Sequence, residues 1–453
     1  MSPNELPPSA DQPVLFADAP SPPASDEPAT KEARLLRGIR GVRLRKADRS
    51  QVSWGRIDLD AQLCPDHPVR ALFAVVERLD LSAFYALIEA RDDRAGTSAI
   101  DPKILLCLWV YALSQGEGSG RELARLAKLH AAYRWLCGGV SISAHTLTDF
   151  RTKRRDQVDG LITQVLTILR QKDLVDLHRI AKDGTRIRAS AGAASFRSEQ
   201  TLQAIAVEVR AHLAQVTEEG ADPDLSARRF AARKRGAKER LARLEAALLQ
   251  IPEVAEVKKR SGAKDKRARV STTDPEARVM KMGDGGFRPA YNVQFAATCD
   301  QARVIVGVSL NNQGSDTGQA TPMRKQVQER TGTRPREQLV DGGYAQHEAI
   351  DEAYEDEVIL YAPVPKPRKE GQDLHLPQKN DSEAVVAWRQ RMGTDEAKEI
   401  YKQRAATIET VNADAKTHRA LDHFAVRGLP GVLGCALLFA LSYDILRLIA
   451  LNG

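Results

Sequence analysis

The spacing of apolar residues changes near residue 175, and this change limits what the chain can fold into. From residue 67 to about 174, apolar residues recur every three or four positions, which is the period of amphipathic helices. In residues 178–191 they alternate with polar residues, which is the period of a strand. After residue 288, strand patterns and helix patterns follow one another. The sequence therefore predicts a helical region followed by an α/β region with a mixed sheet flanked by helices.

The same pattern divides the chain into four segments. Residues 1–50 are rich in Pro, Ser and Asp, and we expect a disordered leader that ends in a basic linker. Residues 51–174 are the helical region. Residues 196–270 return to a helical composition, with a turn at 220–224, and indicate a basic helical hairpin inserted into the sheet domain. That sheet domain is predicted to comprise residues 175–195 and 271–453.

Composition narrows the class of protein. A net charge of +7 and a pI near 9.1 favour an anionic partner such as nucleic acid. The five cysteines are scattered without zinc-ligand spacing, which indicates a reducing compartment. The N-terminus lacks a signal peptide pattern, and the apolar run at 431–443 is too short to span a bilayer, so we expect a cytoplasmic protein with a buried C-terminal helix. The absence of a G-x-x-x-x-G-K-[ST] motif predicts that no nucleotide cofactor is bound.

Two basic regions are candidate DNA contacts. In the segment that begins at Ser143, short helices and a polar helix start suit a helix-turn-helix-like reader of double-stranded DNA. The alternative is a plain helical bundle with a charged surface. The second arm of the hairpin carries a dense run of basic residues, whose alternative interpretation is a solvated helix face. The candidate DNA-binding residues in these two regions are His145, Thr146, Arg151, Arg154, Arg233 and Arg235.

Three acids are candidate metal ligands. Asp183 lies on the apolar, inward face of the first strand, where a lone carboxylate is costly unless it is paired or metal-bound. Asp341 ends the fourth predicted strand before two glycines, and Glu409 lies on a helix predicted over about 395–416. Carboxylates gathered in this way can hold two Mg²⁺ ions for phosphodiester chemistry.

Each acid also has a structural interpretation. Asp183 could be a salt-bridged strand residue and Asp341 a turn former, while Glu409 by itself is an ordinary helix glutamate. Other acids compete for the same role, and His347 could shuttle protons. Asp316 is the most serious substitute because it follows the third strand, although it could also cap a helix. The competing acids are Asp284, Asp316 and Asp414.

Several short motifs accompany these acids. Asp183-Gly184-Thr185 surrounds the first acid, residues 273–278 (TDPEAR) lead into residues 291–294 (YNVQ), and residues 341–344 (DGGY) contain the second acid. Tyr401, Arg404, Glu409 and Lys416 form a Tyr-Arg-Glu-Lys series. With the order of strands and helices, these motifs resemble the ribonuclease-H-like core of DDE transposases from bacterial insertion sequences. The helical segment at 67–174 is similar to the N-terminal domain of the same transposases.

One spacing departs from the family pattern. Three residues usually separate Arg from Glu in this signature, whereas four residues separate Arg404 from Glu409. The six-residue gap from Glu409 to Lys416 is kept. On a continuous α-helix, Lys402, Glu409 and Lys416 fall on nearly one line, so both lysines could meet DNA phosphates beside the acid. Tyr401, Lys402, Arg404 and Lys416 are therefore candidate DNA contacts.

The resemblance implies a function. It predicts an enzyme that binds the terminal inverted repeats of its element, cleaves a DNA strand and joins the freed end to target DNA. Mg²⁺ is the implied metal, with Mn²⁺ as a substitute, and a homodimer assembled on DNA is the implied active form. Two alternatives remain open at this point: a metal-dependent DNA nuclease that cuts without joining, and a domesticated DNA-binding protein without catalysis.

Overall fold

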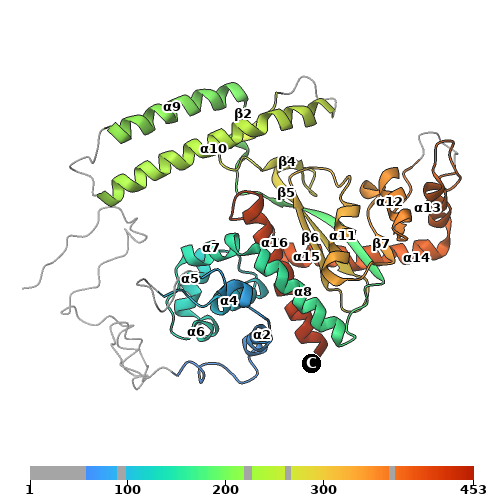
Figure 1. The fold of residues 1–453 in the computed structure, drawn as a ribbon, viewed down its shortest axis with the longest axis horizontal. Helices are drawn as coiled ribbons and strands as arrows, with labels where there is room; N and C mark the ends of the chain where they lie inside the picture. Colours follow the sequence, from blue (N-terminus) through green and yellow to red (C-terminus); the bar gives the residue numbers. More distant parts are fainter. Residues whose placement is uncertain (1–57, 89–97, 219–226, 261–266, 367–372, 453) are drawn as a thin grey trace, which may run out of the picture. The chain divides into compact units, whose positions relative to one another are not determined.

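The computed structural model describes residues 58–88, 98–218, 227–260, 267–366 and 373–452. The predicted leader and basic linker at residues 1–50, and the hairpin turn at residues 220–224, lie outside the described residues. The described residues form helices up to residue 171 and a mixed sheet flanked by helices after it, so the predicted mixed α/β class is confirmed (Figure 1).

The first part of the described chain, up to residue 171, contains helices. Helix starts follow the sequence: His67 caps the first of these helices and Asp101 caps the third, each directly before a proline, while Ser119 and Ser143 cap two others. Gly138, with a φ of 55°, ends another in the left-handed conformation. The helices are α2 (Pro68–Glu77), α3 (Ser82–Tyr85), α4 (Pro102–Ser114), α5 (Gly120–Leu129), α6 (Ala131–Cys137), α7 (Ala144–Lys153) and α8 (Arg155–Gln171).

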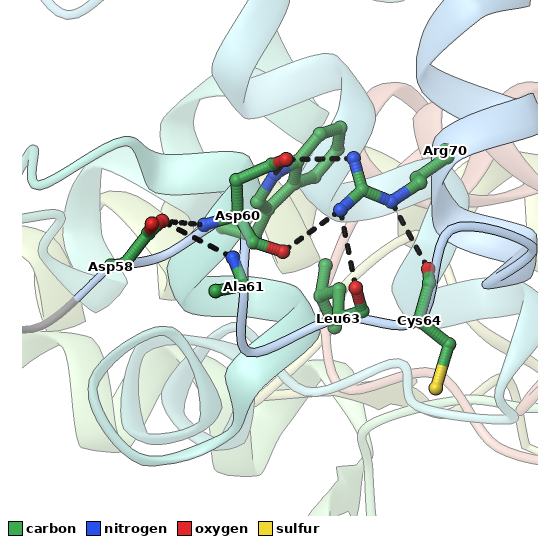
Figure 2. A network of polar contacts seen from close by, with 7 residues as sticks. Asp58, Asp60, Ala61, Leu63, Cys64 and Arg70 are labelled. Atoms are coloured by element: carbon green, nitrogen blue, oxygen red, sulfur yellow. Dashed lines mark hydrogen bonds and ion pairs between the residues drawn. The ribbon is translucent and has the colours of Figure 1, made fainter.

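A polar network fixes the turn that precedes α2 (Figure 2). The Arg70 guanidinium donates to the Asp60 carboxylate (2.7 Å) and to the backbone carbonyls of Asp60, Leu63 and Cys64. The Trp135 indole N–H donates to the same Asp60 carboxylate at 2.9 Å, which ties the turn to α6. These hydrogen bonds from Arg70 and Trp135 lower the pKa of Asp60. The network therefore satisfies four acceptors of a segment without regular secondary structure.

The sheet is mixed. Its antiparallel part is formed by β1 (Arg179–Arg188), β5 (Phe287–Thr298) and β6 (Ile305–Asn311), with β5 between β1 and β6. On the other side, β1 pairs in parallel with β7 (Glu337–Leu339), which pairs in parallel with β8 (Ile359–Tyr361). A short strand, β4 (Arg278–Lys281), pairs with the first residues of β5. The strand order is thus β6-β5-β1-β7-β8, with β4 added beside β5.

Helices accompany the later strands, and most match the sequence prediction. The parallel strands alternate with α11 (Ala320–Thr331) and α12 (His347–Glu355). The helix predicted over 395–416 is divided into α14 (Asp395–Arg404), a π turn (Ala405–Glu409) and α15 (Thr410–Thr417). The sequence analysis missed α13 (Glu383–Gly393), because the whole stretch before about Asp395 was interpreted as a polar loop.

The predicted helical hairpin is present and has its own small core. It consists of α9 (Glu199–Glu218) and α10 (Ala227–Arg260), which lie side by side in Figure 1. Two short strands, β2 (Phe196–Arg197) and β3 (Val270–Ser271), pair at its base. Buried apolar residues from both helices and from β3 form this core, including Leu202, Leu244 and Val270.

The C-terminal helix α16 (Leu429–Asn452) connects the helical region to the sheet. It packs against α2, α4, α7 and α8 and also against β6. Buried residues are found all around it, as expected for a helix enclosed by protein. Of the described helices, α16 is long and apolar enough to cross a membrane by length and composition, but 72% of its most apolar window is buried in the protein. One continuous apolar core therefore includes both the helical region and the sheet.

A buried carboxyl on α16 gives a testable prediction. Asp444 is fully buried; its Oδ1 accepts the N–H of Ile305 at 2.8 Å, and its Oδ2 has no partner among the described residues. Burial raises its pKa well above the usual value. Because the folded pKa exceeds the unfolded one, stability is lost as the pH rises from about 4 through the folded pKa. Asp444→Asn should therefore raise the free energy of unfolding at about pH 8, because the amide carries no charge to bury.

Urea unfolding of both proteins at about pH 5 and about pH 8 measures this effect. The difference in stability between the two pH values should be smaller for Asp444→Asn than for the wild type. Asp156→Asn is the control, because the Asp156 side chain is 79% exposed and should change stability by less than about 0.5 kcal/mol. An Asp444→Asn protein that is less stable than the wild type at about pH 8 would contradict the prediction.

Candidate active site

Asp183 lies on β1, and Asp341 lies two residues beyond the end of β7, the neighbouring parallel strand. The parallel pairing of β1 with β7 ends at the pair Ala181 and Leu339. Asp183 and Asp341 each follow two residues later in the chain. Asp341 is also among the electrostatic neighbours of Asp183, so both carboxylates lie near the same edge of the sheet.

Both aspartates are followed by a glycine and make the same local contact. Oδ1 of Asp183 accepts the N–H of Gly184 at 2.9 Å, and Oδ1 of Asp341 accepts the N–H of Gly342 at 2.7 Å. At Gly184 a side chain is excluded, because a Cβ would lie 2.5 Å from Oδ1 of Asp316 and 2.7 Å from Oδ1 of Asn292. The Asp-Gly sequence on β1 is therefore required by close packing of polar side chains on its other face.

The Arg404 guanidinium lies between Asp183 and Glu409. Its Nη1 is 3.5 Å from Oδ2 of Asp183, and its Nη2 is 3.6 Å from Oε1 of Glu409. Its Nε donates to the Tyr401 hydroxyl at 3.1 Å. The Arg404 side chain is 12% exposed, and its Nη1 has no hydrogen-bond partner among the described residues. These two contacts are too long for good hydrogen bonds, so Arg404 interacts with the two acids mainly through its charge.

The pKa of Asp183 reflects this crowded environment. Burial raises the pKa of its carboxyl, and the nearby negative charges of Asp316 and Asp341 add to that effect. The Arg404 guanidinium and the Gly184 N–H act in the opposite direction. Asp341 also influences Arg404 and Tyr401 electrostatically. The three predicted acids are thus brought into one electrostatic neighbourhood around Arg404.

The π turn explains the unusual spacing between Arg404 and Glu409. In an α-helix, residues five apart are separated by about 140° around the axis. A π turn closes hydrogen bonds between residues five apart, so such residues lie one turn apart on the same side. The additional residue in the signature is accommodated by the wider turn at Ala405–Glu409, and Arg404 still faces Glu409.

The same turn changes the placement of the two lysines. The expectation that Lys402, Glu409 and Lys416 lie on one line assumed a continuous α-helix, and this geometric premise is wrong because the π turn intervenes. Lys402 is exposed and donates to Glu399 on its own helix at 2.5 Å. Lys416 has Asp183 among its electrostatic partners, although burial lowers its pKa. Lys416, rather than Lys402, therefore faces the acids.

A buried polar cluster lies directly beside the acids, and sequence reasoning missed it. Lys182 is fully buried; its ammonium donates to Oε1 of Gln294 at 2.6 Å and lies 3.8 Å from the centre of the Tyr344 ring. Tyr344 donates to the same Gln294 oxygen at 2.5 Å. The amides of Asn292 and Gln294 both donate to Oδ1 of Asp316 at 2.7 Å. Burial lowers the pKa of Lys182 to about 7, although Asp316 and Asp183 raise it.

This cluster joins two of the sequence motifs. Asn292 and Gln294 belong to residues 291–294, and Tyr344 belongs to residues 341–344. The alternation of the amides with Tyr291 and Val293 on an otherwise apolar strand was the available signal. Of the competing acids, Asp316 lies in this cluster, whereas Asp284 pairs with Arg288 (2.8 Å) and Asp414 with Arg419 (3.0 Å). His347 is exposed at the start of α12.

The candidate DNA contacts of the helical region differ in accessibility. His145 is exposed, 3.7 Å from Asp149, and Thr146 shares a hydrogen bond with Ser143 at the start of α7. Arg154 is half-buried between α7 and α8. Arg151 is buried: it donates to the carbonyl of Gly118 at 2.6 Å and lies 4.4 Å from the Trp109 ring. Arg151 lies on the third turn of α7, which faces α4 and α16. Its side chain therefore packs in the core.

The candidate contacts on the hairpin are exposed. Arg233 and Arg235 both lie on the N-terminal half of α10. Arg235 is 4.0 Å from Glu239 on the same helix, a distance at which an exposed pair contributes little. Arg233 lines a shallow cavity with Glu208 and His212 of α9. These two arginines remain available for an external anion.

The acids offer the ligands that Mg²⁺ prefers, since all of them are carboxylate oxygens. In the described part of the chain, no three His, Cys, Asp or Glu side chains lie close enough together to hold a metal ion. Arg404 instead lies between Asp183 and Glu409 and supplies positive charge there. The donor chemistry thus fits a divalent cation, provided that the guanidinium withdraws from the position between the carboxylates.

Fold and site together define a mixed α/β protein in which acids from two parallel strands and a helix approach one guanidinium. Comparison with known families agrees with this class. Residues 57–153 match the family Transposase domain (DUF772), and residues 366–449 match the family Transposase DDE domain. No curated protein and no solved structure matches the chain. The two family matches support the identification of the chain as an insertion-sequence DDE-type transposase, a nucleic-acid-processing enzyme.

The matched ranges cover different parts of the candidate site. The first range includes α2 to α7 and so includes the candidate contacts His145, Thr146 and Arg151. The second range includes Tyr401, Arg404 and Glu409 and most of α16. Asp183 and Asp341 lie outside both ranges. Their assignment therefore depends on the register of β1 and β7.

Proposed function

We propose that this protein binds the terminal inverted repeats of an insertion sequence and catalyses metal-dependent strand cleavage and strand transfer. The observation that supports the proposal is the register of β1 and β7, because Asp183 and Asp341 each follow two residues after its last pair, and Arg404 lies within 3.6 Å of both Asp183 and Glu409. The strand order β6-β5-β1-β7-β8, with its antiparallel and parallel halves, supports a ribonuclease-H-like catalytic core.

In this proposal the three acids bind metal ions, and the basic residues beside them bind DNA phosphates. Asp183, Asp341 and Glu409 would hold Mg²⁺, or Mn²⁺ as a substitute. Bound in pairs, such ions stabilise the attacking and leaving oxygens of a phosphodiester during displacement. Arg404 neutralises Asp183 and Glu409 in the free protein and, once it withdraws, is placed to contact a DNA phosphate with Tyr401 and Lys416 beside it. The buried cluster of Lys182, Gln294 and Tyr344 orients Asp316 and supports β1 from its other face.

The remaining parts of the chain receive roles in the same proposal. Residues 51–174 form the helical DNA-binding region, with His145, Thr146 and Arg154 as accessible candidates. Residues 175–195 and 271–453 form the catalytic domain, and residues 196–270 form a basic insertion that contacts DNA through Arg233 and Arg235. Lys402 is a further DNA candidate on the exposed side of α14. Double-stranded DNA is the partner, and a cytoplasmic homodimer on DNA is the proposed active form.

Cleavage and joining assays test the proposed function. Purified protein is incubated with labelled duplexes that carry the inverted repeats flanking its reading frame, with a target plasmid and with Mg²⁺ or Mn²⁺. We expect nicking at the repeat boundary, appearance of joined product and loss of both activities with a chelator. Cleavage without joining would instead establish a nuclease. Binding of the repeats without cleavage in either metal would contradict the catalytic proposal.

A further inference from the structure

We propose that a cavity lined by four arginines, at the base of the helical hairpin, binds consecutive phosphates of the DNA backbone. This inference rests on the proposed function, because it takes DNA as the substrate. The cavity has a volume of about 370 Å³ and is open to solvent. Its polar lining residues are Arg197, Arg240, Arg243, Arg427, Thr272 and Thr273. They belong to segments other than those that carry Asp341 and Glu409.

Three separate parts of the chain are fastened together to form this cavity. Arg197 is on β2, which pairs with β3, and Thr272 follows β3 directly. The N–H of Thr272 donates to the carbonyl of Ser195 at 3.0 Å, which holds the two segments at the base of the hairpin. Arg240 and Arg243 lie on α10, which is anchored there by Leu244 in the small core of the hairpin.

The fourth arginine is positioned by the motif at residues 273–278. Asp274 accepts the N–H of Gly428 at 3.2 Å, and Glu276 accepts the N–H of Leu429 at 2.8 Å. Asp274 is itself held by the Tyr291 hydroxyl at 2.7 Å. These contacts fix the segment that begins at Arg427 against the loop that carries Thr273. The two acids of the motif therefore bind backbone N–H groups and leave the cavity itself without a carboxylate lining.

Among the described residues, the charges in the cavity have no partner. Within the described part of the chain, none of the four guanidinium groups forms an ion pair or a hydrogen bond. Arg278 in the same motif shows the contrast: it lies 3.5 Å from Glu253 and donates to the carbonyl of Pro275 at 2.8 Å. Four like charges near one cavity repel each other unless an anion lies between them. Guanidinium groups and hydroxyls are the donors that recognise phosphate oxygens.

The arrangement favours a polymer over a small anion. Arg240 lines both this cavity and the neighbouring one that contains Arg233, so the basic lining continues along α10. From Arg233 to Arg243 the helix rises about 15 Å. A DNA strand presents one phosphate per about 3.4 Å of its axis, so this distance corresponds to about four phosphates. Three of the four cavity arginines, Arg197, Arg240 and Arg427, are exposed and accessible to a backbone.

Binding of labelled duplex DNA, measured by fluorescence anisotropy over a series of salt concentrations, tests the inference. The matched pair is Arg240→Gln, in the cavity, and Lys325→Gln, which removes one positive charge from an exposed helix residue of α11, outside the hairpin. Arg240→Gln should weaken binding about tenfold and reduce the slope of log K against log salt by about 1. Lys325→Gln should change the affinity by less than about twofold.

A second variant tests the cavity as a unit. Arg243→Gln with Arg427→Gln removes charges from two segments that only the tertiary structure brings together, and it should weaken binding by more than Arg240→Gln. Because backbone contacts carry no sequence information, the loss should be equal for repeat-containing and unrelated duplexes. Thermal melting of each variant shows that the fold is retained.

The outcomes separate this inference from the proposed function. If the cavity variants bind DNA as tightly as Lys325→Gln does while the wild type cleaves DNA, the cavity inference is overturned and the proposed function stands. If inorganic phosphate stabilises the wild type but not the variants, and DNA affinity is unchanged, the cavity holds a small anion and the inference is overturned. If the wild type binds no DNA, both proposals fail.

Discussion

Asp341→Asn should reduce strand cleavage by about 100-fold to 1,000-fold while leaving DNA binding within about twofold of the wild type. The substitution keeps the shape of the side chain and its contact with the N–H of Gly342 but removes the negative charge. Asp341 is exposed at the end of β7, so the loss of charge should not disturb the core. Asp183→Asn should have an effect of similar size, because the register places it beside Asp341.

Single-turnover cleavage of labelled repeat DNA, with binding measured separately, checks this expectation. Asp284→Asn is the matched control, because Asp284 lies in an exposed turn and pairs with Arg288. It should cleave within about twofold of the wild type. Asp316→Asn distinguishes the two acids that follow strands: a loss equal to that of Asp341→Asn would add Asp316 to the catalytic set. An Asp341→Asn protein that cleaves like the wild type would remove Asp341 from it.

Deleting Ala413 should reduce the stability and the cleavage activity of the protein far more than deleting Ala406 does. Both residues are exposed alanines of the same helical segment. Ala406 lies within the π turn, so its removal lets the turn become an ordinary α-helical one without rotating the flanking helices. Deletion of Ala413 turns the following residues by about 100°, which moves the buried Ala415 out of the core and Lys416 away from Asp183.

Urea unfolding and the cleavage assay measure the contrast. The protein without Ala406 should unfold within about 1 kcal/mol of the wild type and cleave within about tenfold of it, because Arg404 and Glu409 still face each other. The protein without Ala413 should lose more than about 2 kcal/mol of stability. If the two deletions reduce stability and cleavage equally, the π turn is not what accommodates the additional residue in the signature.

Much of the fold could be predicted because its signals are local. The apolar periods located the helices and most strands, and caps such as Asp101 and Ser143 marked where helices begin. Asp183 could be assigned to an inward strand face and Asp341 to a strand end from their immediate neighbours alone. The short strands β2, β3 and β4 and helix α13 were missed, because segments of two to four residues or of mixed composition carry too weak a pattern.

Other features depended on partners far away in the chain. Lys182 precedes Asp183 on β1 and so lies on the opposite face of the strand; that face is also covered, and the ammonium is buried against Gln294 and Tyr344. Arg151 was expected to contact DNA but packs against Trp109 in the core. In both cases the residue type suggested a surface position, and only the packing of remote segments decided otherwise.

The sequence by itself determined the order of helices and strands, the strand placement of Asp183 and Asp341 and the departure in spacing between Arg404 and Glu409. These properties depend on residues within a few positions of one another. The tertiary structure decided that β1 lies beside β7 and that Arg197, Arg240 and Arg427 share one cavity. Such pairings depend on which distant surfaces bury each other, and no local pattern contains that information.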